Sequence, residues 1–216
     1  MLFMVVYWVD YLFGKWHNFA NLNEGINNMK ISERTQKAGL IGMAGSLLFF
    51  VGLLIEYQYD LFPPGNGALF VINQIMFFSA MSGILFMIYS LRGSGALGEK
   101  RFGKISQGIF FGGWAFLIIG GILGLLTGEW DENLFFPIGS LLFLVGGLLT
   151  GIAVLTTRHW QGWRRLAPLG QAVYYIIVMM ILPPLLWGTN EPTLLIESLW
   201  MLTWFLMSLA MYQSAE

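Results

Sequence analysis

The sequence predicts an all-α integral membrane protein, a bundle of six transmembrane helices arranged as three hairpins, with a short interfacial helix at the N-terminus. Three observations predict this fold class. Of the 216 residues, 56% are hydrophobic and only 11% are charged, whereas soluble domains carry about 25% charged residues. Six apolar segments are each long enough to cross about 30 Å of hydrocarbon. Lys and Arg flank these segments at one end only.

Residues 1–30 are predicted to form a cytoplasmic or interfacial segment ahead of the first span. Within it, Met1–Phe13 is apolar but too short to cross a bilayer comfortably, and Lys15, Trp16 and His17 follow it. We expect a helix that lies along the cytoplasmic interface. The alternative is a seventh, thin span, which would place the N-terminus outside.

Residues 31–216 are predicted to form one transmembrane domain of three hairpins, at about 39–91, 105–157 and 169–213. Their apolar runs are continuous, which favours helices over the alternating strands of a β-barrel. The six spans are expected at Gly39–Glu56, Leu69–Leu91, Ile105–Thr127, Leu134–Thr157, Leu169–Gly188 and Leu194–Gln213.

Small residues four positions apart predict where the helices pack, because close backbone approach drives helix association in lipid. Most of the glycine pairs fall in the third and fourth spans, which predicts a tight pair there. In the fifth span, the Pro183-Pro184 pair removes two backbone donors and predicts a kink or an opening near the outer end. The small-residue pairs are Ser79 and Gly83, Gly108 and Gly112, Gly120 and Gly124, and Gly147 and Gly151.

The charged residues predict the orientation of the bundle. The basic connecting segments hold Lys30, Arg34, Lys37, Arg92, Lys100, Arg101, Lys104, Arg158, Arg164 and Arg165. The intervening loops contain no Lys or Arg and carry Glu56, Asp60, Glu129, Asp131, Glu132 and Glu191. By the positive-inside rule, the basic segments and both termini are expected in the cytoplasm. A bacterial plasma membrane fits this topology.

Polar side chains within the spans are costly in lipid and therefore indicate candidate sites. They gather in the outer leaflet, where we expect a shallow polar pocket that is open to the outside. The alternative is purely structural: Glu197 is favoured by a helix N-terminus, and Asn73 and Gln74 bond neighbouring helices. The predicted ligand-binding residues are Glu56, Asn73, Gln74, Pro184, Trp187 and Glu197.

Several kinds of chemistry are not expected from this sequence. It contains no cysteine, which excludes a disulfide, an iron–sulfur cluster and a thiolate nucleophile. Its two histidines, His17 and His159, both sit at the cytoplasmic edge beside a tryptophan, which favours interfacial anchoring over ligation of haem or zinc. We therefore predict no catalytic residues, no metal site and no cofactor.

The leading functional interpretation is a non-enzymatic multi-pass protein that binds a lipophilic ligand, senses the membrane or assembles with another membrane component. An enzyme normally shows a nucleophile–base pair, paired carboxylates or a ligand set, and none is visible in the spans. The first alternative is a facilitative pathway for a small neutral solute. The second is a membrane-embedded enzyme that acts on lipid at the outer face.

The expected partners follow from the topology. The lipid bilayer is the principal one, and a membrane-protein partner or a second copy of the chain is compatible with the small-residue seams. Nucleic acid is not expected. Basic residues at the cytoplasmic surface can attract anionic lipid headgroups, and we expect such contacts at Arg101, Lys104, Arg164 and Arg165.

Overall fold

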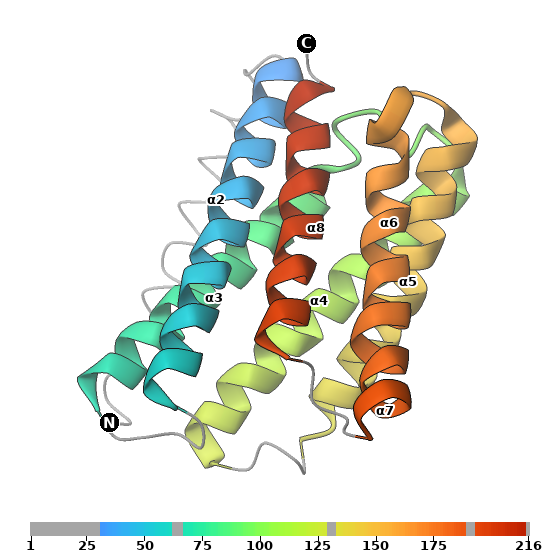
Figure 1. The fold of residues 1–216 in the computed structure, drawn as a ribbon. Coiled ribbons are helices and arrows are strands. Elements are labelled where there is room, and N and C mark those ends of the chain that lie inside the picture. Colours follow the sequence, from blue (N-terminus) through green and yellow to red (C-terminus); the bar gives the residue numbers. More distant parts are fainter. Residues whose placement is uncertain (1–30, 62–66, 129–132, 189–192, 215–216) are drawn as a thin grey trace.

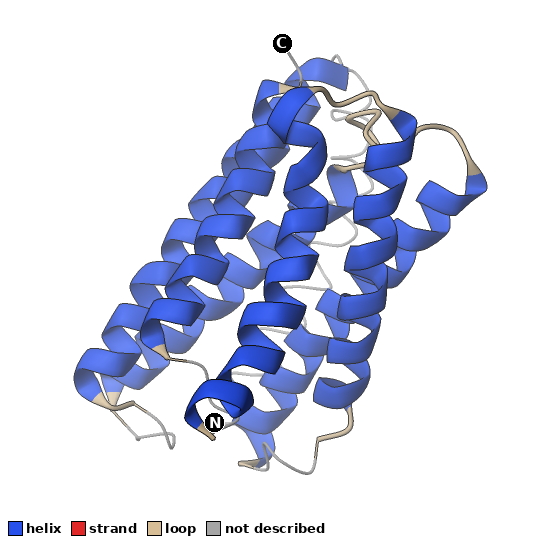
Figure 2. Ribbon diagram, turned by 45° about the vertical axis from the view of Figure 1, so that its right-hand side comes forward, coloured by secondary structure: helices blue, strands red, loops and turns tan. Residues whose placement is uncertain are grey.

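The computed structural model describes residues 31–61, 67–128, 133–188 and 193–214, and all regular structure within these ranges is helical (Figure 1, Figure 2). Six helical segments there are long and apolar enough to cross a membrane. The predicted interfacial helix and the loop residues at 129–132 and 191 lie outside the described ranges. The principal helices are α2 (Ile31–Tyr59), α3 (Ala68–Ser90), α4 (Arg101–Thr127), α5 (Phe135–Thr157), α6 (Ala167–Tyr174), α7 (Leu182–Trp187) and α8 (Leu194–Gln213).

The two ends of the bundle differ in charge. The basic end is where α2 begins and α8 finishes (Figure 1), and every Lys and Arg in the described ranges belongs to it. The acidic end is where α2 finishes and α8 begins, and it holds Glu56, Asp60 and Glu197. At the basic end, α2 starts well before the predicted span. An exposed ion pair between Glu33 and Lys37, 2.9 Å apart at i and i+4, lies on this added part of the helix.

Six of these helices form two groups of three, and α7 extends the span that α6 begins. One group contains α2, α3 and α8, and the other contains α4, α5 and α6 (Figure 1). The most extensive contacts are between α4 and α5, between α2 and α3, and between α2 and α8. The first two predicted hairpins are therefore packed pairs. In the third, α8 packs more extensively on α2 than on its sequence neighbour α6.

Glycines explain why α2 has two close neighbours. A Cβ atom on Gly39 would lie only 2.7 Å from the main-chain nitrogen of Tyr212 in α8. A Cβ atom on Gly45 would lie 2.8 Å from the carbonyl oxygen of Ala80 in α3. Because both distances are shorter than a real Cβ contact, only glycine permits these two approaches.

The predicted tight pair of α4 and α5 is confirmed, but its glycines differ from most of those expected. Gly113 and Gly146 face the backbone of the partner helix at Phe143 and Phe110. By contrast, Gly108 and Gly112 have no described atom within 4 Å of an added Cβ, so the prediction that they form a seam was wrong. Helical spacing places small residues on one face but does not say which helix lies opposite that face.

The pair at Gly147 and Gly151 has a neighbour in the fifth span besides the expected one in the third. A Cβ on Gly147 would lie 3.3 Å from that of Ala172, and a Cβ on Gly151 would lie 2.6 Å from the Cα of Leu169. Both neighbours belong to α6. A Cβ on Gly147 would also lie 3.3 Å from the ring of Phe110 in α4, so Gly147 packs the fourth span against both the third and the fifth, whereas Gly151 packs it against the fifth.

The fifth span changes its helical form along its length. A 3₁₀ turn at Gly162–Leu166 leads into α6, a π-helical stretch follows at Tyr175–Ile181, and α7 completes the span. The wide turns come directly before Pro183 and Pro184, which lack the N–H groups that a regular α-helix requires. The predicted interruption at the prolines is thus present as a π-helical segment.

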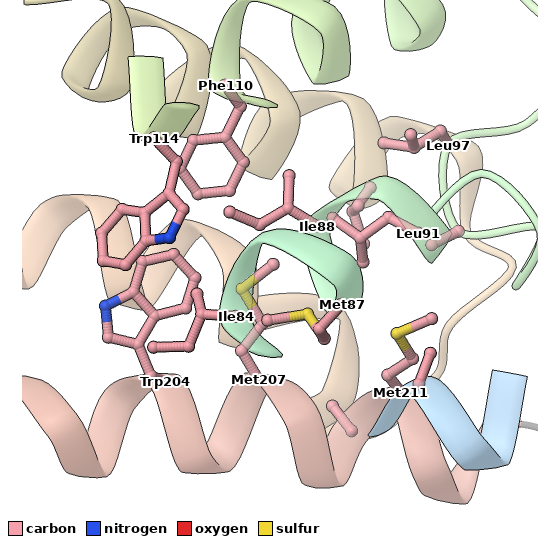
Figure 3. Packing of buried hydrophobic residues seen from close by; sticks show 14 of the residues in the cluster. Ile84, Met87, Ile88, Leu91, Leu97, Phe110, Trp114, Trp204, Met207 and Met211 are labelled. Atoms are coloured by element: carbon pink, nitrogen blue, oxygen red, sulfur yellow. The ribbon is translucent and has the colours of Figure 1, made fainter. Parts of the chain in front are cut away.

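Aromatic and methionine side chains fill the space between the two groups of helices. Figure 3 shows Trp114 of α4 and Trp204 of α8 facing each other, with Ile84 and Met87 of α3 beside them. The two indole rings are 4.9 Å apart between centroids. Trp114 is 1% exposed, and its Nε1 donates a hydrogen bond to the carbonyl oxygen of Met81, 2.8 Å away. This contact ties α4 to α3 at the middle of the bundle.

Candidate functional site

A cavity of about 400 Å³ lies toward the acidic end, walled by α2, α3, α4, α5 and α8. Most of its surface is apolar. Three polar side chains come from three different helices: Glu56 from α2, Gln74 from α3 and Glu197 from α8. The aromatic part of the wall consists of Phe49, Phe77, Phe78, Phe136 and Trp200.

The two carboxyl groups occupy opposite kinds of helix end. Glu56 lies near the end of α2, whereas Glu197 lies in the first turn of α8. That turn is capped by Thr193, whose carbonyl oxygen accepts from the Glu197 main-chain nitrogen at 3.0 Å. Its hydroxyl oxygen accepts from the main-chain nitrogen of Ile196 at 3.5 Å. The positive end of the α8 dipole therefore favours a negative charge on Glu197.

Glu56 and Glu197 line the same cavity. Their carboxyl groups are close enough for electrostatic repulsion, and the Tyr57 side chain is hydrogen-bonded to Glu197. None of the described residues that line the cavity is Lys, Arg or His. Two carboxyl groups in a partly desolvated site without a cation repel each other when both are charged, so the site favours a ligand that brings positive charge or hydrogen-bond donors.

The aromatic wall was not predicted from the sequence. Phe49 and Phe77 pack edge to face with centroids 4.7 Å apart, and Phe49 lies 6.3 Å from the ring of Trp200. Trp200 also has a buried Nε1 donor with no hydrogen-bond partner among the described residues. Phenylalanines are so frequent in the spans that no periodic signal marks these particular ones. Only the packing of α2 against α3 and α8 brings them together.

The structure brings together three of the six predicted ligand-binding residues. Asn73 does not line the cavity: its side chain is fully buried, and its Oδ1 would lie 3.4 Å from a Cβ placed on Gly52 of α2. Both of its amide atoms lack a described hydrogen-bond partner. Adjacent helical residues point about 100° apart, which separates Asn73 from Gln74.

The other predicted residues lie in the fifth span. Pro184 is exposed and is absent from the cavity wall, which includes no residue of the fifth span. Trp187 is the last residue of α7, and its side chain lies outside the described part of the structure. Of the residues predicted for the outer pocket, the cavity therefore includes those of α2 and α8 and one of the two in α3, but neither of those in the fifth span.

A second cavity of about 550 Å³ lies at the basic end, between α2, α3 and α4. The two cavities share no lining residue. Along α4, the first includes Leu117 and the second includes Phe111, with the buried Trp114 between them. The basic cavity is lined by Arg34, Thr35, Tyr89, Ser90, Arg92, Lys104, Gln107, Gly108 and Phe111, among others.

Neither cavity offers a recognisable metal centre. Within the described ranges, no group of three His, Asp or Glu side chains is placed to hold a metal ion. Comparison of the chain with protein-family models, with curated proteins and with solved structures finds no match.

Proposed function

We propose that the chain is an integral membrane protein whose basic end faces the cytoplasm, in a bacterial plasma membrane. The outward faces of the helices support this assignment. Large apolar side chains are exposed on them, including Leu141 at 63%, Val71 at 54% and Leu185 at 74%. Water would penalise so much exposed apolar surface, whereas lipid would cover it. The confinement of the described Lys and Arg to one end supports the orientation.

Within that membrane protein, the acidic-end cavity serves to bind a lipophilic ligand that carries a cationic or hydrogen-bond-donating group. The observation that carries this proposal is the placement of Glu56 and Glu197 in one mainly apolar wall, whose described residues include no Lys, Arg or His. The aromatic rings would hold the apolar body of the ligand, and their faces also attract a cation. The carboxylates would hold its polar end.

A facilitative pathway for a neutral solute is less well supported. Such a pathway requires a continuous cavity between the two ends, and Trp114 separates the two cavities in this conformation. An enzyme acting on lipid at the outer face would use Glu56 or Glu197 as acid or base. The carboxyl pair is placed for either binding or catalysis, but no nucleophile accompanies it in the described wall.

The test uses two probes that match in shape and differ in charge, tetraphenylphosphonium and tetraphenylborate. Each is equilibrated by dialysis with the full chain in detergent. We expect the cation to bind and the anion not to bind. At a separation of about 6 Å and an effective dielectric constant of about 20, one carboxylate contributes about 3 kcal/mol. Even half of that changes the Kd about tenfold.

The variants assign the binding to the cavity. Glu56→Gln and Glu197→Gln keep the shape of each side chain and remove its charge, so each should weaken binding of the cation at least about tenfold. Glu99→Gln, in an exposed segment at the basic end, is the matched control and should leave the Kd unchanged. Equal binding of both probes, or equal loss in the control, would overturn the proposal.

A further inference from the structure

The basic-end cavity gathers three cationic side chains from separate parts of the chain. Arg34 comes from the start of α2, Arg92 from the turn after α3, and Lys104 from the first turn of α4. No Asp or Glu is among the described residues that line it. Like charges repel across such a space, so an anion bound between them would relieve that repulsion.

Uncharged groups complete the polar part of this wall. Ser90 is only 5% exposed, and its hydroxyl has no hydrogen-bond partner among the described residues. Gln107 is fixed in place, because its Nε2 donates to the carbonyl oxygens of Ile88 and Tyr89, each 2.7 Å away. A buried hydroxyl without a partner is costly unless a ligand or water satisfies it. Beside three cations, an oxygen-rich anion is the ligand that fits.

One side of the cavity is apolar. The rings of Tyr89 and Phe111 lie 6.1 Å apart, and the Arg34 guanidinium lies 6.0 Å from the centre of the Tyr89 ring. Tyr89 is 55% exposed. Gly108 leaves open space next to them, since no described atom lies within 4 Å of an added Cβ. The basic side chains thus lie next to an aromatic side of the cavity that has open space at Gly108. A ligand with both a charged group and an apolar part fits this arrangement better than a soluble ion does.

We propose that this cavity binds the phosphate headgroup of an anionic membrane lipid. Arg34, Arg92 and Lys104 hold the phosphate, and the Ser90 hydroxyl donates to one of its oxygens. The acyl chains leave past Tyr89, Gly108 and Phe111, between α3 and α4. This assignment rests on the proposed membrane location of the chain but not on ligand binding in the acidic-end cavity.

The cavity includes only part of the set of basic residues that the sequence predicted to contact lipid headgroups. Of the four basic residues expected there, only Lys104 lines the cavity. Arg164 is committed elsewhere, because its Nη1 donates to the carbonyl oxygen of Gln213, 2.7 Å away, at the end of α8. Arg101 and Arg165 are exposed at the same end of the bundle, outside the cavity. They therefore provide matched controls.

The experiment measures lipid adducts on the full chain by native mass spectrometry. Phosphatidylglycerol and zwitterionic phosphatidylcholine are added separately to the detergent-solubilised protein, and inorganic phosphate is added as a competitor. One triple variant carries Arg34→Gln, Arg92→Gln and Lys104→Gln. A control triple variant carries Lys100→Gln, Arg101→Gln and Arg165→Gln, which removes the same charge from the same end. A third variant, Gly108→Leu, keeps every charge and fills the open space.

Phosphatidylglycerol should bind in preference to phosphatidylcholine, and inorganic phosphate should not displace it. Each basic residue near a lipid surface contributes about fivefold, so the cavity triple variant should bind on the order of 100-fold more weakly. The control triple variant should lose much less than that. Gly108→Leu should weaken binding about fivefold or more, since it blocks the space proposed for the acyl chains. If the triple variant does not fold, Gly108→Leu still tests whether the lipid binds in this cavity.

Three results would overturn the assignment: equal losses in the two triple variants, unchanged binding in Gly108→Leu, or displacement of the lipid by inorganic phosphate. Resistance of the chain to alkaline extraction from membranes is measured in parallel. If the chain is extracted, the membrane assignment fails and this proposal fails with it. If the chain resists extraction and the variants bind like the wild type, only the lipid site fails.

Discussion

Gly112 and Gly113 are adjacent on α4 and provide a sharp test of the packing. A Cβ atom on Gly113 would lie 2.6 Å from the Cα of Phe143 in α5, whereas a Cβ on Gly112 would have no described atom within 4 Å. The main-chain nitrogen of Phe143 would lie closer still, and ordinary contact begins at 3.4 Å, so Gly113→Ala requires the helices to move more than about 0.8 Å apart. Gly112→Ala requires no movement.

The difference between these two variants isolates the steric cost. Both alanines gain about 1 kcal/mol of helix propensity over glycine. Only Gly113→Ala overpacks a backbone contact, which costs about 1–3 kcal/mol. We therefore expect Gly113→Ala to be less stable than Gly112→Ala by about 2 kcal/mol.

The assay is unfolding in mixed micelles with increasing dodecyl sulfate, followed by circular dichroism. Gly146→Ala serves as a second test from the α5 side, since its Cβ would lie 2.5 Å from the Cα of Phe110. It should resemble Gly113→Ala. If Gly113→Ala and Gly112→Ala unfold at the same detergent fraction, the α4–α5 contact described above is wrong.

Three further predictions concern topology and stability. The native chain has no cysteine, so single cysteines can report which end of the bundle is outside. An impermeant maleimide added to intact cells should label Asp60→Cys at the acidic end and should label Glu99→Cys only after lysis. The opposite pattern would contradict the proposed orientation. Trp114→Phe removes the buried hydrogen bond from α4 to α3 and should lower the unfolding free energy by about 1 kcal/mol. Trp163→Phe alters an exposed ring and should lower it little. Similar losses in the two variants would contradict a stabilising role for the Trp114 hydrogen bond. Arg158 ends α5 with a φ of 57°, so Arg158→Gly should raise the unfolding free energy by about 1 kcal/mol; a lower value would contradict the left-handed cap.

The positions of the helices along the chain were largely predictable. The span at Leu194–Gln213 coincides with α8, and the spans expected at Leu69–Leu91 and Leu134–Thr157 differ from α3 and α5 by one residue at one or both ends. Hydropathy locates such segments well because transfer into lipid depends on local composition. Hydropathy does not show where a helix ends when charged residues extend it beyond the apolar segment. The start of α2 is such a case.

The sequence predicted the level of the candidate site residues along the helix axes, but not the side of each helix on which their side chains lie. Glu56, Gln74 and Glu197 were expected near one level, and they line one cavity. Asn73 was expected at the same level, yet it faces α2, because one step along a helix turns the side chain by about 100°. The gathering of Arg34, Arg92 and Lys104 was not foreseen, since no sequence spacing relates three separate segments.

The sequence by itself determined the number of apolar helices and the separation of charge between the two ends, because both follow from local composition. Only the tertiary structure decided which helices are neighbours. Gly39 and Gly45 let α8 and α3 approach α2, and Gly113 lets α5 approach α4. Close contact depends on what lies opposite each small residue, and that partner comes from a distant part of the chain. Both cavities are walled by residues of α2, α3 and α4, which no sequence spacing relates.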